Sequence, residues 1–345
     1  MTLSRQQHKK NKVGMTIIFV EALHGINYHR MIVPFLRMQE KGLVNLHVVS
    51  DAFELLHFDL THVDTFVVSR TLYAKVEGAE LFAKKLKENN VKFIVDLDDY
   101  WKVERHNPNF KLFRGKGGFS EAIRSTVELA DEIWTPSEYL ANEIRTELNP
   151  TAVFRIVPNG INPEEAQWQG EKNTGDELWF GYTGASSHTK DLQLVRHIDW
   201  EQYNTMAVHM AHVDYIGQLK ANKKILAKPI FEYATIYQEI DVSIVPLQNT
   251  HFNLCKSSIK AAEAGFTRTA MIASDVEPYR EVIVNNETGI LCSNMEQWRE
   301  AIASMTKKEA KRLGDNLYES VREKYHIDTV NEERLKGLNH AVSHV

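Results

Sequence analysis

Short apolar runs alternate with longer segments of helical spacing along most of the chain. Runs rich in β-branched and aromatic residues are typical of strands buried in a sheet. Strands that alternate with helices form parallel βαβ units with right-handed crossovers. In the first half of the chain, the predicted strands lie at 13–20, 43–50, 63–69, 91–99, 130–137 and 152–160.

The same alternation resumes after a polar, aperiodic stretch at 162–177, which we predict to be an interdomain linker. Beyond it, the predicted strands lie at 178–184, 206–211, 241–247, 269–274 and 289–292. The segment from Lys307 onwards has helical spacing with interspersed charges. We therefore predict an α/β protein of two doubly wound, Rossmann-like domains. The carboxyl ends of their strands are expected to face each other across a cleft.

The domain boundaries follow from these patterns. We place the first domain at 13–165 and the second at 166–324. The last segment, 325–345, is expected to form a helix that crosses back to the first domain. The basic segment 1–12 is expected to be a flexible tail.

Composition narrows the class of protein. The chain has 345 residues, which suits two domains, and 43% hydrophobic with 25% charged residues describes a water-soluble fold. The net charge of −5 argues against a surface that coats nucleic acid. Two separate cysteines, Cys255 and Cys292, outside any CxxC pattern, indicate reduced thiols in a cytoplasmic protein. No apolar run is long enough to predict a membrane helix.

The first candidate for chemistry is the stretch "CKSSIKAAEAG", which follows a predicted strand and opens a helix. The amino end of a helix presents unpaired N–H groups and partial positive charge, and Ser257 or Ser258 can cap it. Lys256 adds a full charge, so this end suits a pyrophosphate. Glu263 lies further along the helix among small residues. We expect it to accept hydrogen bonds from the ribose of the same nucleotide.

This stretch, with the following "TAMIASDVEPYREVI" and "NNETGILCS", resembles the donor-binding region of retaining glycosyltransferases of family 4, which have the GT-B fold. Glu263 matches the second of the family's two glutamates. The first glutamate's position holds Cys255, which departs from the pattern. The segments "IVPNGIN" and "WTPSEYLANEI" are similar to family segments at the end of the first domain.

The resemblance extends to the loop "FGYTGASSHTKDL". In the family this loop holds the donor diphosphate with an arginine and a lysine. Lys190 matches the lysine, whereas Ala185 occupies the arginine's place. His188 lies between them and is a candidate substitute donor, although a surface histidine is the plainer interpretation. Gly184 allows the backbone to approach a phosphate closely.

In the first domain the segment "HGINYHRMIVPF" follows the first predicted strand. Gly25 stands where the family's glycine-rich loop approaches the donor phosphate. We assign Tyr28 and Arg30, which follow Gly25, to acceptor binding, and a phosphate is the alternative ligand for Arg30.

The acidic stretch "DLDDYWKVERH" ends another predicted strand. Asp96, Asp98 and Asp99 form a D-x-D-D pattern, for which metal binding is one interpretation. Since the second domain already supplies cations for a diphosphate, we instead assign Asp96 and Asp98, with His106, to acceptor binding. Asp99 joins Lys190 and His188 as candidate catalytic residues. No metal site and no cofactor are predicted.

The resemblance implies transfer of a hexose or pentose from a nucleoside-diphosphate sugar, UDP- or GDP-type, to an acceptor hydroxyl, with retention and without metal. The acceptor is expected to be a glycan, lipid or protein. One alternative is a phage-type DNA glycosyltransferase acting on a modified base. A second is a nucleotide-sugar binding protein without catalysis, suggested by the departures at Cys255 and Ala185. The oligomeric state is not predicted.

Overall fold

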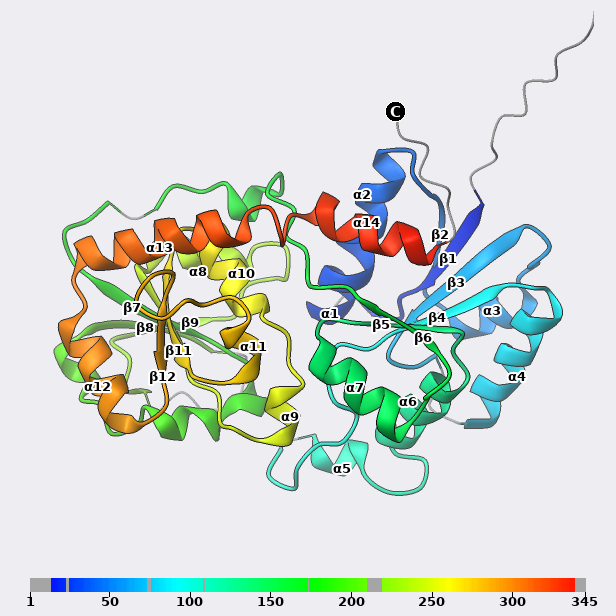
Figure 1. Cartoon of the computed structure of the whole chain (residues 1–345), viewed down its shortest axis with the longest axis horizontal. Coiled ribbons are helices and arrows are strands. Elements are labelled where there is room, and N and C mark those ends of the chain that lie inside the picture. Colours follow the sequence, from blue (N-terminus) through cyan, green and yellow to red (C-terminus); the bar gives the residue numbers. More distant parts are fainter. Residues whose placement is uncertain are drawn as a thin grey trace, which may run out of the picture.

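The alternation of apolar strands and helices produces two parallel sheets, as the sequence predicts. The computed structural model describes residues 14–22, 25–72, 76–107, 109–172, 174–209 and 219–338. The predicted tail at 1–12 lies outside these residues. Figure 1 shows the two halves side by side, with the first-half sheet on the right and the second-half sheet on the left.

Six parallel strands form the first sheet, in the order β2-β1-β3-β4-β5-β6. Each predicted strand of the first half contains one of them. The strands are β1 (Met15–Phe19), β2 (Asn45–Val49), β3 (Val63–Ser69), β4 (Lys92–Asp96), β5 (Glu132–Thr135) and β6 (Val153–Ile156).

The second sheet also has six parallel strands, in the order β12-β11-β10-β7-β8-β9. Sequence analysis missed β9, because this edge strand begins with two exposed lysines and carries no continuous apolar run. The strands are β7 (Trp179–Thr183), β8 (Asn204–His209), β9 (Lys223–Leu226), β10 (Val242–Val245), β11 (Ala270–Ser274) and β12 (Ile290–Cys292).

Helices connect the strands and cover both faces of each sheet (Figure 1). In the first half they are α1 (Gly25–Asn27), a π-helical turn (Tyr28–Ile32), α2 (Val33–Glu40), α3 (Ala52–His57), α4 (Val76–Glu88), α5 (Phe110–Phe113), α6 (Phe119–Glu128) and α7 (Glu138–Glu147). In the second half they are α8 (Ile236–Glu239), α9 (His251–Leu254), α10 (Ile259–Phe266), α11 (Glu277–Arg280), α12 (Met295–Ser304), α13 (Lys307–Val321) and α14 (Ile327–Gly337). Short 3-10 turns lie at Ala166–Trp168, Ser186–His188, Asp191–Leu194, Trp200–Gln202 and Tyr233–Thr235.

The core follows the alternation of side chains along each strand. In β1, Ile17 and Phe19 belong to one apolar cluster of the first domain, whereas Ile18 between them belongs to another. The second sheet is likewise covered by separate clusters, since Ile272 of β11 joins one and Met271 joins the other. Each sheet is therefore buried on both faces, as parallel sheets require.

Both sheets contain a point at which the chain reverses its direction of winding. In the first sheet β2 lies on one side of β1, and β3 lies on the other. In the second sheet β8 and β10 flank β7 in the same way. Loops leaving the carboxyl ends of adjacent strands diverge at such a switch point, which opens a crevice for a ligand. In the first domain the diverging loops are those after β1 and β3. In the second domain they are those after β7 and β10.

The segment predicted to be a linker is docked rather than loose. The described residues of 162–177 contain a single 3-10 turn, yet Gln167 and Trp168 in this turn are only 2% and 7% exposed. Glu165 accepts a hydrogen bond from the hydroxyl of Tyr28 in the first domain. These contacts fix the path of the chain between the two sheets.

Helix α14 lies against the first domain although it follows the second domain in sequence (Figure 1). Asn331 Nδ2 donates to the carbonyl of Pro34 at 3.0 Å, and Arg37 Nε donates to Asp328 Oδ1 at 3.1 Å. Both contacts join α14 to α2. The chain thus crosses between the domains a second time.

We expect Gly314→Ala to lower the free energy of unfolding by about 2 kcal/mol or more. A Cβ at Gly314 in α13 would lie 2.3 Å from the carbonyl oxygen of Arg268, a backbone atom that cannot rotate away. Gly25→Ala is the matched control, because its Cβ would meet only Ile230 Cδ1 at 3.7 Å. Urea unfolding of both variants checks the difference. Equal midpoints would contradict this view of the α13 contact.

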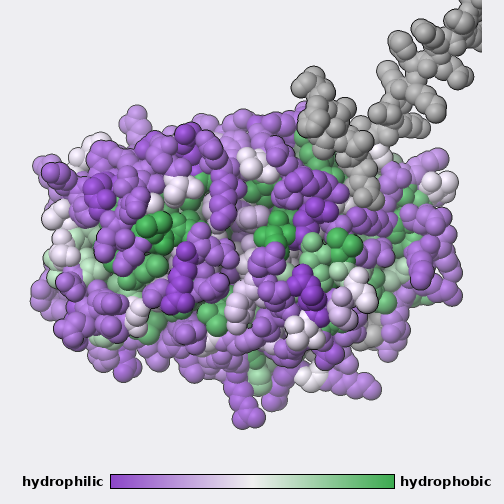
Figure 2. All heavy atoms as spheres, viewed as in Figure 1, coloured by the Kyte–Doolittle hydropathy of each residue, from purple (hydrophilic) through white to green (hydrophobic). Residues whose placement is uncertain are grey.

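The surface shown in Figure 2 is mostly hydrophilic, with hydrophobic residues in small separate patches. Among the described residues, no helix combines the length and the apolar character that crossing a bilayer requires.

Candidate functional site

Residues from the switch points of the two sheets meet between the domains. Lys256 follows β10, and its Nζ lies 3.3 Å from Oδ1 of Asp99, which follows β4. Arg70 follows β3 and donates to Asp99 Oδ2 at 2.8 Å and to Asp98 Oδ1 at 2.9 Å. This chain of contacts brings together two predicted site residues, Asp99 and Lys256, that are far apart in sequence.

The electrostatics of Asp99 reflect this arrangement. Burial alone would raise the pKa of the Asp99 carboxyl, but the charges of Lys256 and Arg70 outweigh burial and lower the pKa below its usual range. Asp99 is therefore ionised at neutral pH and holds both cations in place.

The three aspartates of the D-x-D-D pattern are each bound to arginine. Asp96 Oδ2 accepts from Arg30 Nη2 at 2.8 Å, while Asp98 and Asp99 both accept from Arg70. A metal ion would have to displace these charge-assisted bonds. The arrangement favours the interpretation of ion pairing over that of a metal site.

Arg30 lies deeper than the sequence suggests. Its side chain is 1% exposed, and Nη1 donates to the carbonyl of Val157 at 3.0 Å and to Asn159 Oδ1 at 2.9 Å. Asn159 Nδ2 in turn donates to Ser257 Oγ at 2.8 Å. Arg30 and Asp96 thus connect the first sheet to the start of α10, and an acceptor would reach them only by displacing these partners.

Tyr28 is also buried, at 8% exposed. Besides the bond to Glu165, its hydroxyl accepts from Gln167 Nε2 at 3.4 Å. The assignment of Tyr28 to acceptor binding stays a prediction, and the structure gives this side chain a role in holding the interdomain segment.

The loop after β7 carries a histidine–aspartate pair. His188 Nδ1 lies 2.7 Å from Asp191 Oδ2, and Asp191 Oδ1 accepts from the N–H of Gln248 at 2.8 Å and from Asn253 Nδ2 at 3.0 Å. Burial lowers the pKa of His188, and the positive charge of Lys256 lowers it further against the opposing effect of Asp191. The imidazole is therefore neutral at neutral pH.

Lys190 and His106 share a small pocket between the domains. It has a volume of about 10 Å³, and Glu104 and Asp191 are among the residues that line it. The Lys190 side chain is exposed, whereas His106 Nδ1 lies 3.1 Å from Glu104 Oε2. The structure thus places Lys190 beside the His188–Asp191 pair and opposite the segment that follows the aspartates.

The two predicted glycines differ in what they permit. A Cβ at Gly184 would lie 2.3 Å from the hydroxyl oxygen of Tyr182, so a side chain there would force the Tyr182 ring to shift. Gly25 has room for a side chain, since its nearest neighbour is Ile230 of the second domain.

Glu263 is the centre of a buried network in α10. It is 2% exposed; Oε1 accepts from the Tyr233 hydroxyl, and Oε2 accepts from the Tyr237 hydroxyl and from Lys260 Nζ, both at 2.8 Å. Lys260 Nζ also donates to Thr183 Oγ1 at the end of β7, at 3.1 Å. Although burial opposes its charge, the pKa of Glu263 is lowered by Lys260.

The predicted serine cap of α10 is not formed. Ser258 occupies the N-cap position, but its Oγ lies 2.8 Å from the Tyr325 hydroxyl instead of bonding to the helix. Among the described residues, no side chain therefore covers the first-turn N–H groups as an N-cap. The N–H of Ala261 donates to the Ser258 carbonyl at 2.9 Å, whereas the N–H groups of Ile259 and Lys260 precede this first intrahelical bond.

Cys255 stands where the family that the sequence resembles has a glutamate, and its surroundings are apolar. It is 0% exposed and belongs to the apolar cluster of the first domain, so it packs across the domain boundary. Burial raises the pKa of the thiol. The residue is therefore an apolar contact between the domains.

We expect the pH dependence of stability to report on His29, whose ring packs edge-on against Tyr233 at 5.8 Å. Burial lowers the pKa of His29 to about 4, with Glu263 opposing and Lys260 reinforcing the shift. Between pH 6.5 and 4 the unfolded chain binds a proton that the folded chain does not. The free energy of unfolding must therefore fall as pH falls through this window.

Wild type should lose about 3 kcal/mol more than His29→Gln between pH 7 and pH 4. Urea unfolding at the two pH values measures the difference. Parallel losses in both proteins would show that His29 titrates normally in the folded state.

Sequence analysis missed several residues of this region. Arg70 follows a strand end, Asp191 lies three positions after His188, and Lys260 lies three positions before Glu263, so spacing was an available signal for each. For Arg334 of α14, spacing along the sequence offered no signal, because this residue is about 240 positions or more away from Asp96 and Arg30 and meets them only through packing of α14 on the first domain. Burial and the charge of Arg30 lower the pKa of Arg334 to about 9.

No protein family model matches the chain. Solved structures do resemble it. HepE from Anabaena, in complex with UDP and glucose, has 10% sequence identity and a TM-score of 0.65, with 96% of this chain and 100% of that chain covered. A glycosyltransferase from Rickettsia africae has 14% identity and a TM-score of 0.64, with the same coverage of both chains.

TarM has 14% identity and a TM-score of 0.58; the match covers 84% of this chain, which spans 57% of the TarM chain. At such low identities the likeness concerns the fold. Together with the two parallel sheets and the second crossing by α14, it shows that this chain has the GT-B fold of these structures.

Proposed function

We propose that this protein transfers a sugar from a nucleoside-diphosphate sugar of the UDP or GDP type to an acceptor hydroxyl. The observation that carries the proposal is that the two switch points meet through Asp99, which contacts both Arg70 after β3 and Lys256 after β10. Crevices of this kind are the ligand sites of doubly wound sheets. Similar structures support the same class, since HepE was solved with UDP and with UDP-glucose.

The diphosphate is assigned to the start of α10. First-turn N–H groups and the helix dipole attract an anion, and Lys256 supplies a full charge beside them. Lys190 extends from the loop after β7, on the other side of the same switch point. Together these groups stabilise the negative charge that grows on the leaving diphosphate.

The nucleoside is assigned to the middle of α10. Oε1 of Glu263 accepts only from Tyr233 among the described donors, whereas Oε2 already accepts from two groups. Oε1 therefore has the lone pair that a ribose hydroxyl needs. Lys260 fixes the carboxylate and keeps it ionised.

In the proposed step, the acceptor oxygen bonds to the anomeric carbon on the face from which the diphosphate departs, so configuration is retained. The bond between that carbon and the phosphate oxygen breaks, and its electron pair leaves with the diphosphate. The hydroxyl proton passes to a phosphate oxygen. His188 is neutral in the free protein, and the incoming negative charge favours its protonation, which makes it a donor to the diphosphate.

The proposal is tested by incubating the protein with UDP- and GDP-sugars and measuring release of UDP or GDP. The acceptor panel contains glycans, a lipid-linked sugar, a protein and DNA with hydroxymethylated bases. EDTA should leave the rate unchanged, since the aspartates are bound to arginines. Binding of donor without release in any arm would favour a non-catalytic binding protein, and release only with DNA would favour the DNA glycosyltransferase.

A further inference from the structure

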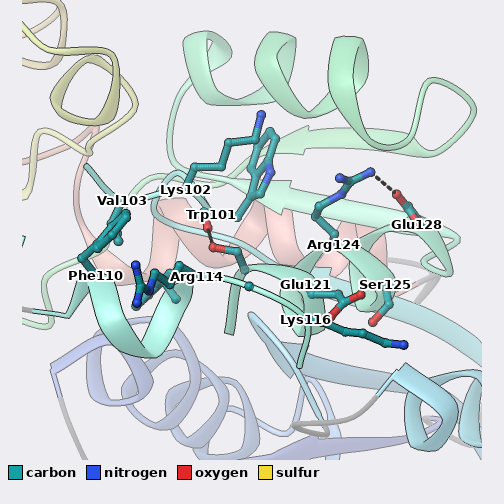
Figure 3. Close-up of a pocket in the computed structure, with 13 residues that line it drawn as sticks. Trp101, Lys102, Val103, Phe110, Arg114, Lys116, Glu121, Arg124, Ser125 and Glu128 are labelled. Carbon is teal, nitrogen blue, oxygen red and sulfur yellow. Dashed lines mark hydrogen bonds and ion pairs between the residues drawn. The ribbon is translucent and has the colours of Figure 1, made fainter. Parts of the chain in front are cut away.

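A second and much larger pocket lies in the first domain, separate from the small interdomain pocket beside Lys190. Its volume is about 790 Å³, within the range of pockets that hold small ligands. It is lined by residues that follow the aspartates and by α5 and α6 (Figure 3). The proposed diphosphate and nucleoside seats use none of these residues.

The segment 101–107 connects this pocket to the cleft. Trp101, Lys102 and Val103 line the large pocket. Glu104 and His106, which follow directly, line the small interdomain pocket with Lys190. A ligand held in the large pocket therefore lies next to the segment that reaches the proposed donor.

The pocket is rich in cations that differ in how they are neutralised. Lys102 is bonded to Glu147, and Arg124 Nη2 is bonded to Glu128 Oε1 at 3.3 Å. By contrast, Arg114 and Lys116 form no ion pair among the described residues. Figure 3 shows these two side chains extending in different directions from the segment between α5 and α6. The unpaired positive charge is thus spread along the pocket.

The backbone of this segment is built to present Lys116. Gly115 and Gly117 on either side of it have φ angles of +83° and +74°, which favour glycine. At Gly118 a Cβ would lie 2.6 Å from the carbonyl oxygen of Arg114. Three glycines therefore hold the turn, and the lysine is its only side chain between them.

The remaining lining suits sugar rings. Phe110 provides an apolar wall, and the Arg114 guanidinium lies over its ring at 5.6 Å from the centroid. Trp101 is 0% exposed, and its indole N–H has no hydrogen-bond partner among the described residues. Glu121 offers carboxylate oxygens that accept hydrogen bonds from hydroxyl groups.

From these features we infer that the pocket binds the acceptor, and that the acceptor is an acidic oligosaccharide with anionic groups on more than one sugar. That this ligand is the acceptor of a sugar rests on the proposed function. Nucleic acid fits less well, because the Glu121 carboxylate needs hydroxyl donors, which every sugar ring offers and a phosphate backbone lacks.

The test uses tetragalacturonate, which carries one carboxylate on each sugar, and its methyl ester, which has the same shape without the charge. Titration calorimetry should show saturable binding of the acid that weakens with added salt. We expect the ester to bind at least about tenfold more weakly, because it cannot pair with Arg114 and Lys116.

The double variant Arg114→Gln/Lys116→Gln should weaken binding of the acid by about tenfold. Lys87→Gln/Lys111→Gln is the charge-matched control, since these lysines are exposed and lie outside the pocket. Equal binding of acid and ester, no binding of the acid to wild type, or the same loss in the control would overturn the inference. If a single-stranded oligonucleotide binds more tightly than the acid, and this binding depends on Arg114 and Lys116, the ligand of the pocket is nucleic acid and the inference is overturned.

UDP titrated into the same samples separates this inference from the proposed function. The pocket variants should bind UDP as wild type does. If wild type binds the acid but neither UDP nor GDP, the proposed function fails while the pocket assignment for acidic sugars stands. If UDP or GDP binds but the acid does not, the pocket assignment fails while the proposed function stands.

Discussion

Lys256→Gln should lower kcat/KM for the nucleotide sugar by about 100-fold, the effect expected when one preorganised positive donor to a developing anion is lost. The Lys256 ammonium sits at the start of α10, 3.3 Å from Asp99 and 4.6 Å from the centre of the Phe252 ring. Its charge therefore faces the place assigned to the leaving diphosphate. Initial rates of UDP or GDP release measure the loss.

Lys308→Gln on α13 is the control, because it removes the same charge from an exposed position of the second domain. Its kcat/KM should stay within about twofold of wild type. A Lys256→Gln enzyme that turned over at the wild-type rate, with its fold intact, would place the diphosphate elsewhere.

Glu263→Gln should also lower kcat/KM, by about 100-fold, and should lower the free energy of unfolding by about 2 kcal/mol. The amide cannot match three donors as the carboxylate does, and Lys260 loses its anionic partner. Part of the effect is thus structural. Glu300→Gln on the surface of α12 serves as the matched control.

Tyr233→Phe separates the two roles of Glu263. It removes the only described donor to Oε1 and leaves Tyr237 and Lys260 in place. If Oε1 receives a ribose hydroxyl, the variant should bind UDP at least as tightly as wild type. A large loss of UDP affinity in Tyr233→Phe, measured by calorimetry, would assign the network to structural support alone.

The fold was predictable because its signal is local. Buried parallel strands are near-continuous apolar runs. Of the twelve described strands, ten lie within predicted ones, and β8 overlaps its predicted strand. The exception, β9, is an edge strand with two exposed lysines and shows no such run. Strand order is set by packing between distant segments, which no local pattern encodes.

The site was predictable where a residue's place depends on a strand end. Asp99 follows β4 of the first sheet, whereas Lys190 and Lys256 follow β7 and β10 of the second. Parallel strands bring such positions to the carboxyl edge of their own sheet. Burial was not predictable in this way. Tyr28 and Arg30 follow β1 and resemble open cleft residues in sequence, yet the docked interdomain segment and Asp96 enclose them.

A crystal structure of the protein with bound UDP tests the central claim most directly. We predict the diphosphate within hydrogen-bonding distance of the first-turn N–H groups of α10 and of Lys256 Nζ, with the ribose towards Glu263. UDP bound away from α10, or a site that stays empty at saturating UDP and GDP, would contradict the assignment of this cleft to a nucleotide sugar.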